Sequence, residues 1–146
     1  MNDDAFKTIY NKALDILSRR EHSKKELYDK LLKKFDAPEL VESIVDSLSE
    51  RKLINDSRYC EAYVVARKRK GFGPKKILYE LISRGVDENI ATESIYAEGG
   101  WKDAASKAFN KKYKTGIGKD FKEQNKQKIF LQNRGFSFEE IESVFS

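Results

Sequence analysis

A shift of 50 residues along this chain of 146 superimposes its apolar pattern on itself twice. The coinciding sets are Leu31, Leu81 and Leu131; Ile9, Tyr59 and Phe109; Ala13, Tyr63 and Tyr113; Val41, Ala91 and Ile141; Ile44, Ser94 and Val144; and Val45, Ile95 and Phe145. Arg84-Gly85 also falls on Arg134-Gly135. A period of this length is typical of arrays in which each small unit packs against its neighbours. The chain is therefore predicted to contain three copies of one unit.

Each copy has the periodicity of helices. Apolar residues recur every three or four positions over residues 9–17, 27–32 and 40–48, and no alternation of the kind seen in strands extends over several residues. Copies near residues 5–50, 56–98 and 103–146 each hold three such segments. The predicted fold is all-α: three tandem three-helix repeats in an elongated, curved array, with units at 1–55, 56–98 and 99–146.

Helix ends are marked by residues with known capping roles. Ser23-Lys24-Lys25-Glu26 and Ser137-Phe138-Glu139-Glu140 have the form of capping boxes. Pro38 and Pro74 suit the first turn of a helix, and Gly85 and Gly135 suit left-handed positions after a helix. Phe35 stands where the other two copies have glycine, so the second helix of the first copy is predicted to end differently.

The composition excludes several classes of protein. One cysteine and one histidine, Cys60 and His22, permit neither an intramolecular disulfide nor a usual zinc site. No residue set for a nucleophile or an acid–base pair stands out, so no catalytic residue, cofactor or metal is predicted. The acidic start and the absence of a long apolar run predict a cytoplasmic protein without membrane spans.

Basic residues are unevenly distributed along the chain. Residues 1–56 contain 11 basic and 12 acidic residues, residues 57–84 contain 8 and 2, and residues 99–146 contain 10 and 6. A positive middle and C-terminal third favour a polyanionic partner, although a solvated lysine-rich surface is the alternative.

The densest feature is the run Arg67-Lys68-Arg69-Lys70-Gly71-Phe72-Gly73-Pro74-Lys75-Lys76, with six basic residues and no acid. A turn between two helices can hold phosphates with side chains and with the amides that open the second helix. An acidic protein groove would fit equally well, and cations at a helix end can be merely solvated. The predicted partner- or DNA-binding residues are Arg67, Lys68, Arg69, Lys70, Lys75, Lys76 and Arg84, followed by Lys112 and Arg134.

Weaker motifs favour structural roles. Gly116-Ile117-Gly118-Lys119 lacks the first glycine of a phosphate-binding loop and the Ser or Thr after its lysine, so an inter-helix turn is predicted. His22 is predicted to be a turn residue and Cys60 a small buried one. Four aromatic residues at helical spacing could stack on bases but are more often core: Tyr59, Tyr63, Phe72 and Tyr79.

Three blocks of the sequence resemble signatures of the RecX family, whose members regulate the bacterial recombinase RecA. The first is Arg19-Arg20-Glu21-His22-Ser23 with Glu26-Leu27. The central block runs from Leu53 through Asn55-Asp56-Ser57-Arg58-Tyr59, Ala62-Tyr63, Arg67 and Gly71-Phe72-Gly73-Pro74 to Leu81 and Arg84-Gly85-Val86. The closing block is Asn133-Arg134-Gly135-Phe136-Ser137 with Ile141, so the resemblance spans about residues 10–146.

The resemblance implies a non-enzymatic protein that lies in the groove of the RecA filament on DNA and modulates its ATPase and strand exchange, with inhibition as the expected sign. Its implied partners are the RecA filament and single- or double-stranded DNA, and a monomer is expected. Two other classes stay open. A stand-alone DNA-binding module would bind DNA tightly and with steep salt dependence without a recombinase, and a helical scaffold would use the basic run only as solvated surface.

Overall fold

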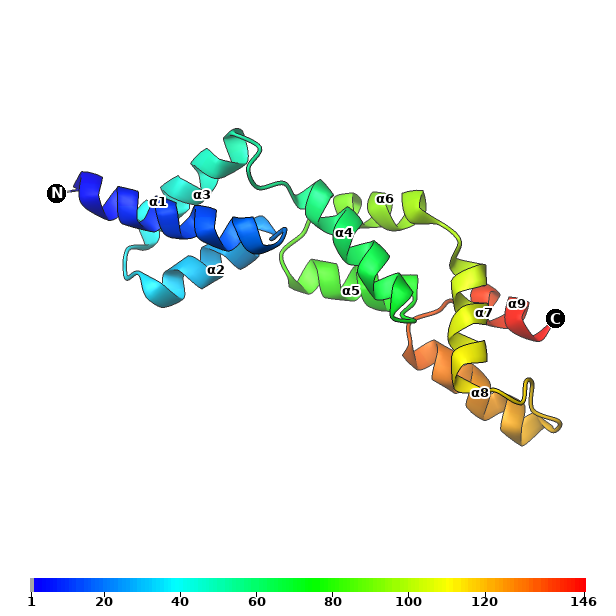
Figure 1. Ribbon diagram of the computed structural model, residues 1–146. Helices are drawn as coiled ribbons and strands as arrows, with labels where there is room; N and C mark the ends of the chain where they lie inside the picture. The colour runs from blue at the N-terminus through cyan, green and yellow to red at the C-terminus, as the bar shows by residue number, and fades with distance from the viewer. Residues whose placement is uncertain (1) are drawn as a thin grey trace.

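The computed structural model describes residues 2–146, and these residues form nine helices and no strand. The first unit contains α1 (Asn2–Arg19), α2 (Lys24–Lys34) and α3 (Pro38–Glu50). The second contains α4 (Asp56–Arg69), α5 (Pro74–Ser83) and α6 (Glu88–Glu98), and the third contains α7 (Trp101–Lys112), α8 (Phe121–Asn133) and α9 (Phe138–Phe145). Figure 1 shows the units following one another in a curved, elongated array. The predicted fold class is confirmed.

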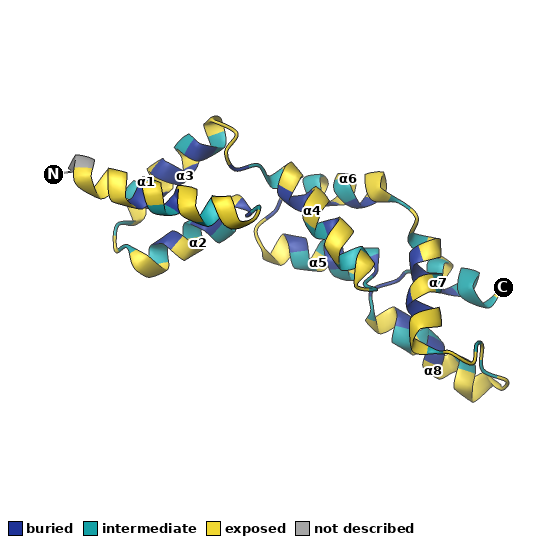
Figure 2. Cartoon of the chain, in the orientation of Figure 1, coloured by how far each residue is buried: buried dark blue, intermediate teal, exposed yellow. Residues whose placement is uncertain are grey.

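Each unit has its own core, because the helices pack extensively only within their unit. The repeat positions supply these cores: Leu31, Leu81 and Leu131 are fully buried, and Ile9, Tyr59 and Phe109 are 2%, 3% and 2% exposed. Figure 2 shows buried segments in all three units. The predicted limits of the units, 1–55, 56–98 and 99–146, stay predictions.

The caps form as the sequence indicates. Ser23 and Ser137 each accept a hydrogen bond from the amide three residues on, and Glu26 and Glu140 complete the two capping boxes. Gly85 and Gly135 have φ of 84° and 98° after α5 and α8. Phe35 instead ends α2 in an extended conformation with φ of −126°, which confirms the predicted departure of the first unit.

Second helices of neighbouring units meet end to end. The end of α5 touches the start of α2, which we call the first junction, and the end of α8 touches the start of α5, the second junction. In Figure 1, α2, α5 and α8 accordingly follow one another along the lower edge of the molecule. Each contact places the negative end of one helix dipole against the positive end of the next, which is favourable. None of the helices that the structure describes has the length and apolarity needed to cross a membrane.

Candidate functional site

The predicted basic run lies where α4 turns into α5. Arg67, Lys68 and Arg69 form the last turn of α4, Lys70 caps it, and Lys75 opens α5 after Pro74. The amide of Phe72 donates to the carbonyl of Arg67, which closes the turn. The run is therefore a compact corner from which side chains leave in several directions.

Arg67 is held inside the second unit. Its guanidinium makes two hydrogen bonds to the Glu80 carboxylate, at 2.9 and 2.8 Å, and lies 3.9 Å from the centre of the Phe72 ring. Tyr63 donates to the same carboxylate at 2.7 Å. Burial alone would raise the pKa of Glu80, but the hydrogen bonds from Arg67 and Tyr63 and the nearby positive charges lower it overall. Arg67 thus already has a carboxylate partner.

Lys68 is also paired. Its ammonium lies 2.8 Å from the Glu98 carboxylate and donates to the Gly99 carbonyl at 2.8 Å. These contacts join the end of α4 to the segment that leads into α7. Lys68 therefore connects the second unit with the start of the third.

The remaining predicted residues of the run have no carboxylate partner among the residues that the structure describes. Arg69, Lys70 and Lys75 are exposed, and Lys76 is half-buried with its ammonium 5.6 Å from the Phe72 ring centre. These four residues are the free charges of the run.

The amides at the start of α5 have a different role from the phosphate contacts that the sequence suggests. Gly73 donates to the Arg134 carbonyl at 2.7 Å, and Lys75 donates to the Gly135 carbonyl at 2.9 Å. Both amides are therefore occupied by the end of α8. The expectation of free amides is wrong for Gly73 and Lys75, because the third unit occupies both of them.

Arg134 lies at the second junction. Its guanidinium donates to the Lys70 carbonyl at 3.4 Å and lies 4.9 Å from the Phe72 ring centre and 5.0 Å from that of Phe130. The Phe72 ring thus has both Arg67 and Arg134 against it. This stack ties the second and third units together.

Arg84 has the corresponding place at the first junction. Its carbonyl accepts a hydrogen bond from the Ser23 hydroxyl at 3.0 Å, and its guanidinium lies 3.1 Å from Glu26. Burial raises the pKa of the adjacent Tyr59 to about 12, with a contribution from the charge of Glu26. The structure therefore gives Arg84 and Arg134 contacts between units, separate from the exposed lysines.

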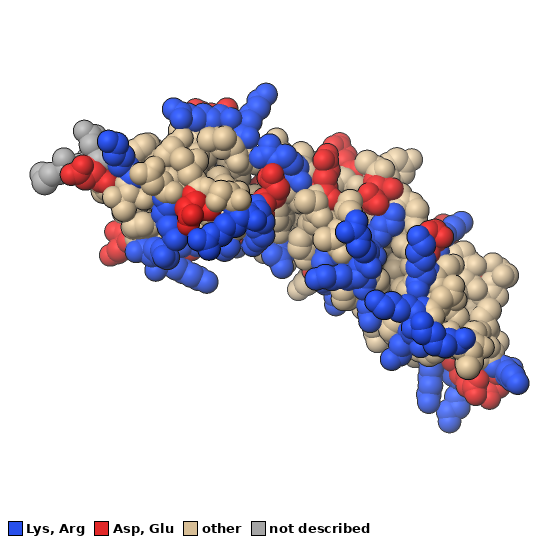
Figure 3. All heavy atoms as spheres, in the orientation of Figure 1, with Lys and Arg blue, Asp and Glu red and all other residues tan. Residues whose placement is uncertain are grey.

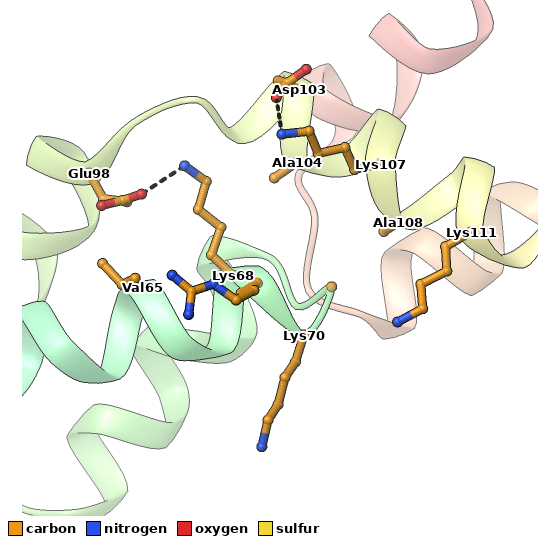
Figure 4. Close-up of a pocket in the computed structure, with 11 residues that line it drawn as sticks. Val65, Lys68, Lys70, Glu98, Asp103, Ala104, Lys107, Ala108 and Lys111 are labelled. Atoms are coloured by element: carbon orange, nitrogen blue, oxygen red, sulfur yellow. Dashed lines mark hydrogen bonds and ion pairs between the residues drawn. The ribbon is translucent and has the colours of Figure 1, made fainter. Parts of the chain in front are cut away.

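A basic groove runs beside the end of α4 and along α7. Figure 3 shows lysine and arginine side chains gathered there. In Figure 4, Lys68 and Lys107 turn toward acids, whereas Lys70 and Lys111 extend to the other side. Of the predicted residues, the groove brings together Lys68, Arg69, Lys70, Lys112 and Arg134, and it leaves Arg67, Lys75, Lys76 and Arg84 outside. Sequence reasoning did not select Lys107 or Lys111, although their i,i+4 spacing places them on one face of a helix.

Most of the other motifs have structural roles. Tyr59 and Cys60 are buried, and Tyr63 and Phe72 are half-buried against the core of the second unit. Tyr79 is 75% exposed, so the prediction of a core position is wrong for this residue. Burial raises the pKa of Cys60 to about 11, which disfavours its reactive thiolate.

His22 lies in the turn before α2, as predicted, and is buried there. Its ring nitrogens lie 2.9 Å from the Arg20 carbonyl and 2.7 Å from the Lys30 ammonium. Residues 113–120 form the predicted turn between α7 and α8. No cluster of three metal-ligating side chains occurs within the described part of the chain.

Comparison with known proteins gives a consistent result across the whole chain. Residues 10–48, 55–95 and 102–145 match the first, second and third three-helix domains of RecX. The chain is 35% identical over 144 residues to the regulatory protein RecX of Pseudomonas fluorescens (strain SBW25), covering 98% of this chain and 93% of that protein. It is 32% identical over 141 residues to the regulatory protein RecX of Halorhodospira halophila, covering 96% and 88%.

A solved structure agrees with the sequence matches. The crystal structure of RecX from Lactobacillus salivarius superimposes with a TM-score of 0.82 at 28% identity, and the match covers 99% of this chain and 96% of that one. The fold, the three domain matches and the near full-length relatives lead to one conclusion: this chain belongs to the RecX family, a family of non-enzymatic regulatory proteins.

Proposed function

We propose that this protein binds the RecA filament on DNA and modulates, in the inhibitory direction, its ATPase and strand-exchange activities. The observation that carries the proposal is an elongated array of three units with a cluster of exposed basic side chains beside the second junction. Four of these side chains, Arg69, Lys70, Lys111 and Lys112, are exposed. A long partner with repeated negative charge suits such a surface. The relatives' name, regulatory protein, supports a role in controlling another protein.

The proposed mechanism is steric and electrostatic. Three stacked units can contact neighbouring recombinase subunits while the exposed basic residues lie near DNA phosphates. Such a contact changes the filament only if the protein binds one of its states more tightly than another. The protein would act as a monomer in the cytoplasm, and the nine predicted basic residues would supply the contacts, with Arg67, Lys68, Arg84 and Arg134 contributing mainly by holding the units in place.

The direct test measures the ATPase rate of the cognate recombinase on single-stranded DNA while this protein is titrated at substoichiometric ratios. The expected result is a lower rate at concentrations too low to coat the DNA. DNA binding by the protein alone is measured in parallel. Strong, salt-sensitive DNA binding with an unchanged ATPase rate would instead favour the stand-alone DNA-binding module, for which the unpaired basic residues are the favouring observation.

A charge-reversal pair locates the effect on the surface. Arg69→Glu with Lys75→Glu changes two exposed side chains that make no ion pair in the described structure, so helical content should be retained. Lys7→Glu with Lys33→Glu is the control of equal charge on exposed positions of the first unit. The first pair should abolish the effect on the ATPase and the control should keep it. If both double variants changed the ATPase rate to the same extent, the basic run would not be part of the proposed contact.

A further inference from the structure

Two hollows at the second junction adjoin and form one trough. One is about 320 Å³ and lies between the end of α4 and α7, and the other is about 230 Å³ and continues toward α8. They share Lys70, Gly71, Ala108 and Lys111. We call the combined hollow the junction trough. Its basic side chains are Lys68, Arg69, Lys70, Lys107, Lys111, Lys112 and Arg134.

The charge of the junction trough is strongly unbalanced. Its two acids are both paired: Glu98 lies 2.8 Å from Lys68, and Asp103 lies 3.2 Å from Lys107. No carboxylate of the described residues lies within ion-pair distance of the remaining basic residues, which are Arg69, Lys70, Lys111, Lys112 and Arg134. Lysines gathered without acids repel one another, so an anion that enters the trough relieves an unfavourable arrangement.

The trough is open enough for a polymer backbone to pass. Arg69, Lys70, Lys111 and Lys112 are all exposed, and Gly71 and Ala108 lie between them with short or absent side chains. Figure 4 shows Lys70 and Lys111 extending from different helices toward the same open side. Cations from two units can therefore contact successive phosphates of one strand.

The junction trough offers no free aromatic surface on which bases could stack. Phe130 is the one aromatic residue that lines the described trough, and its ring has Arg134 at 5.0 Å and Lys112 at 5.8 Å from its centre. Nucleic-acid proteins that hold unpaired bases use open aromatic faces for stacking, whereas phosphate contacts need only cations. The cations against Phe130 therefore favour phosphate contacts over base contacts.

We propose that the junction trough binds the sugar–phosphate backbone of nucleic acid through phosphate contacts alone, independently of base sequence. This inference rests on the proposed function. It deepens that proposal by assigning the DNA contact to the junction trough, which lies between the end of α4 and α7. An acidic protein segment is the competing occupant, and the experiment below separates the two.

The test uses fluorescence anisotropy with the full chain between 50 and 300 mM salt. The three probes are a 30-nucleotide oligo-dT, a 30-nucleotide single strand of mixed sequence and a 30-base-pair duplex of mixed sequence. The variant is Lys70→Gln with Lys111→Gln, and the control of equal charge is Lys7→Gln with Lys33→Gln. All four positions are exposed, so circular dichroism should show unchanged helix content.

Each phosphate contact contributes about 0.9 to the slope of log affinity against log salt on duplex DNA. The variant should therefore lose about 2 from the wild-type slope and at least about tenfold in affinity at 100 mM salt. The control should keep both values. Mixed-sequence and homopolymer single strands should bind within about threefold of each other, since no base is read.

Three results would overturn the inference: no binding of the wild-type protein to any probe, wild-type DNA binding whose salt slope the trough variant leaves unchanged, or binding that depends strongly on base identity. Recombinase ATPase measured on the same proteins keeps the two proposals apart. Regulation by a wild-type protein that binds none of the probes would refute the DNA contact and leave the proposed function intact. DNA binding lost in the variant, without any effect of wild type on the ATPase, would support the trough and refute the regulator.

Discussion

The two junctions bring the same helix ends together by different means. At the first junction the Ser23 hydroxyl spans the gap and donates to the Arg84 carbonyl at 3.0 Å. At the second junction the backbone amide of Gly73, the residue equivalent to Ser23, donates directly to the Arg134 carbonyl at 2.7 Å. A side chain therefore separates the first pair of units, whereas backbone meets backbone in the second pair.

The cause of this difference lies in the capping residues. The Ser23 amide is occupied by the Glu26 carboxylate of its capping box, at 3.1 Å, so only its hydroxyl can reach the next unit. The second unit has Lys76 where the first has Glu26, so no capping box forms and the Gly73 amide is available. The second unit has Gly-Pro-Lys-Lys where the first has its capping box. The hydrogen bond between units therefore comes from a backbone amide at the second junction and from a side-chain hydroxyl at the first.

The side-chain contacts also differ between the two junctions. Glu26 at the first junction accepts from both Arg20 and Arg84, at 3.2 and 3.1 Å. The second junction instead stacks Arg134 on Phe72, and Trp101 packs against the cores of both the second and the third units. We infer that the second junction is the tighter one and keeps the two walls of the junction trough together.

The largest effect is expected for Gly73→Ala. A Cβ at this position would lie 2.5 Å from the Gly135 carbonyl carbon and 2.6 Å from its oxygen, and neither atom can move without the backbone. The φ of Gly73 is −97°, which alanine adopts readily, so the cost arises from the clash between units. Urea unfolding should show a loss of about 2 to 3 kcal/mol.

Gly73→Ser is the matched control, because serine is the better N-cap and is the residue found at the first junction. If the loss came from capping, serine would restore stability; if it comes from the close approach, serine should be as damaging as alanine. An unchanged unfolding midpoint in both variants would contradict the tight second junction.

Much of the fold follows from local patterns that the sequence displays. Three of the six sets that the 50-residue shift aligned, those of Leu31, Ile9 and Val41, are buried in all three units, and the other three are buried in the first unit and half-buried in at least one other. The serine–glutamate spacing identified both capping boxes. These features depend on residues within one helix or one repeat, so periodicity and capping chemistry suffice to predict them.

The free and the paired basic residues could not be separated in the same way. Arg67 and Lys68 adjoin Arg69 and Lys70 in sequence, but their partners Glu80 and Glu98 lie 13 and 30 residues further along. Only the packing of α4 against the neighbouring elements decides which cation meets an acid. The occupied amides at Gly73 and Lys75 depend in the same way on the third unit.

Gln127 is a polar residue at a repeat position that is apolar in the other two copies, and the apolar pattern alone did not explain it. It is the equivalent of Leu27 and Ile77 and is 6% exposed, yet it accepts from the Gly118 amide at 2.9 Å and donates to the Gly116 carbonyl at 3.1 Å. A polar residue at a core position of one copy indicated a hydrogen bond to a local loop.

A smaller effect is expected for Ser23→Ala at the first junction. The substitution removes the hydroxyl that accepts from the Glu26 amide and donates to the Arg84 carbonyl, at an expected total of about 1 to 2 kcal/mol. Ser137→Ala removes an equivalent cap that makes no hydrogen bond to another unit in the described structure. The excess loss in Ser23→Ala over Ser137→Ala, expected at about 1 kcal/mol, measures the bond across the junction. Equal losses would mean that this bond contributes nothing.

The stack at the second junction should show as a coupling between Phe72 and Arg134. A double-mutant cycle of Phe72→Leu and Arg134→Met isolates their interaction, expected at about 0.5 to 1 kcal/mol. No carboxylate takes part in the stack, so the coupling should be constant between pH 4 and pH 8. A coupling that falls with pH would indicate a carboxylate at this junction, contrary to the described contacts.

The smallest expected effect is a loss of stability at the first junction as the pH falls. It also separates the two junctions most sharply. Burial alone would raise the pKa of Glu26, but hydrogen bonds from Arg20 and Ser23 and the charges of Arg20 and Arg84 lower it below its ordinary value of 4.5. A carboxyl group whose pKa is lower in the folded state stabilises the fold above the unfolded value and loses that contribution as pH falls through the folded pKa.

Glu26→Gln keeps an oxygen for the Ser23 amide but removes the charge that faces Arg20 and Arg84. It should cost about 0.5 kcal/mol in urea unfolding at pH 7, because both arginines are about half exposed. The gap between wild type and variant should close as the pH falls below 4.5, since protonated Glu26 carries no charge either. A gap that stays constant down to low pH would show that the glutamate acts by shape, and the electrostatic contrast between the two junctions would then be lost.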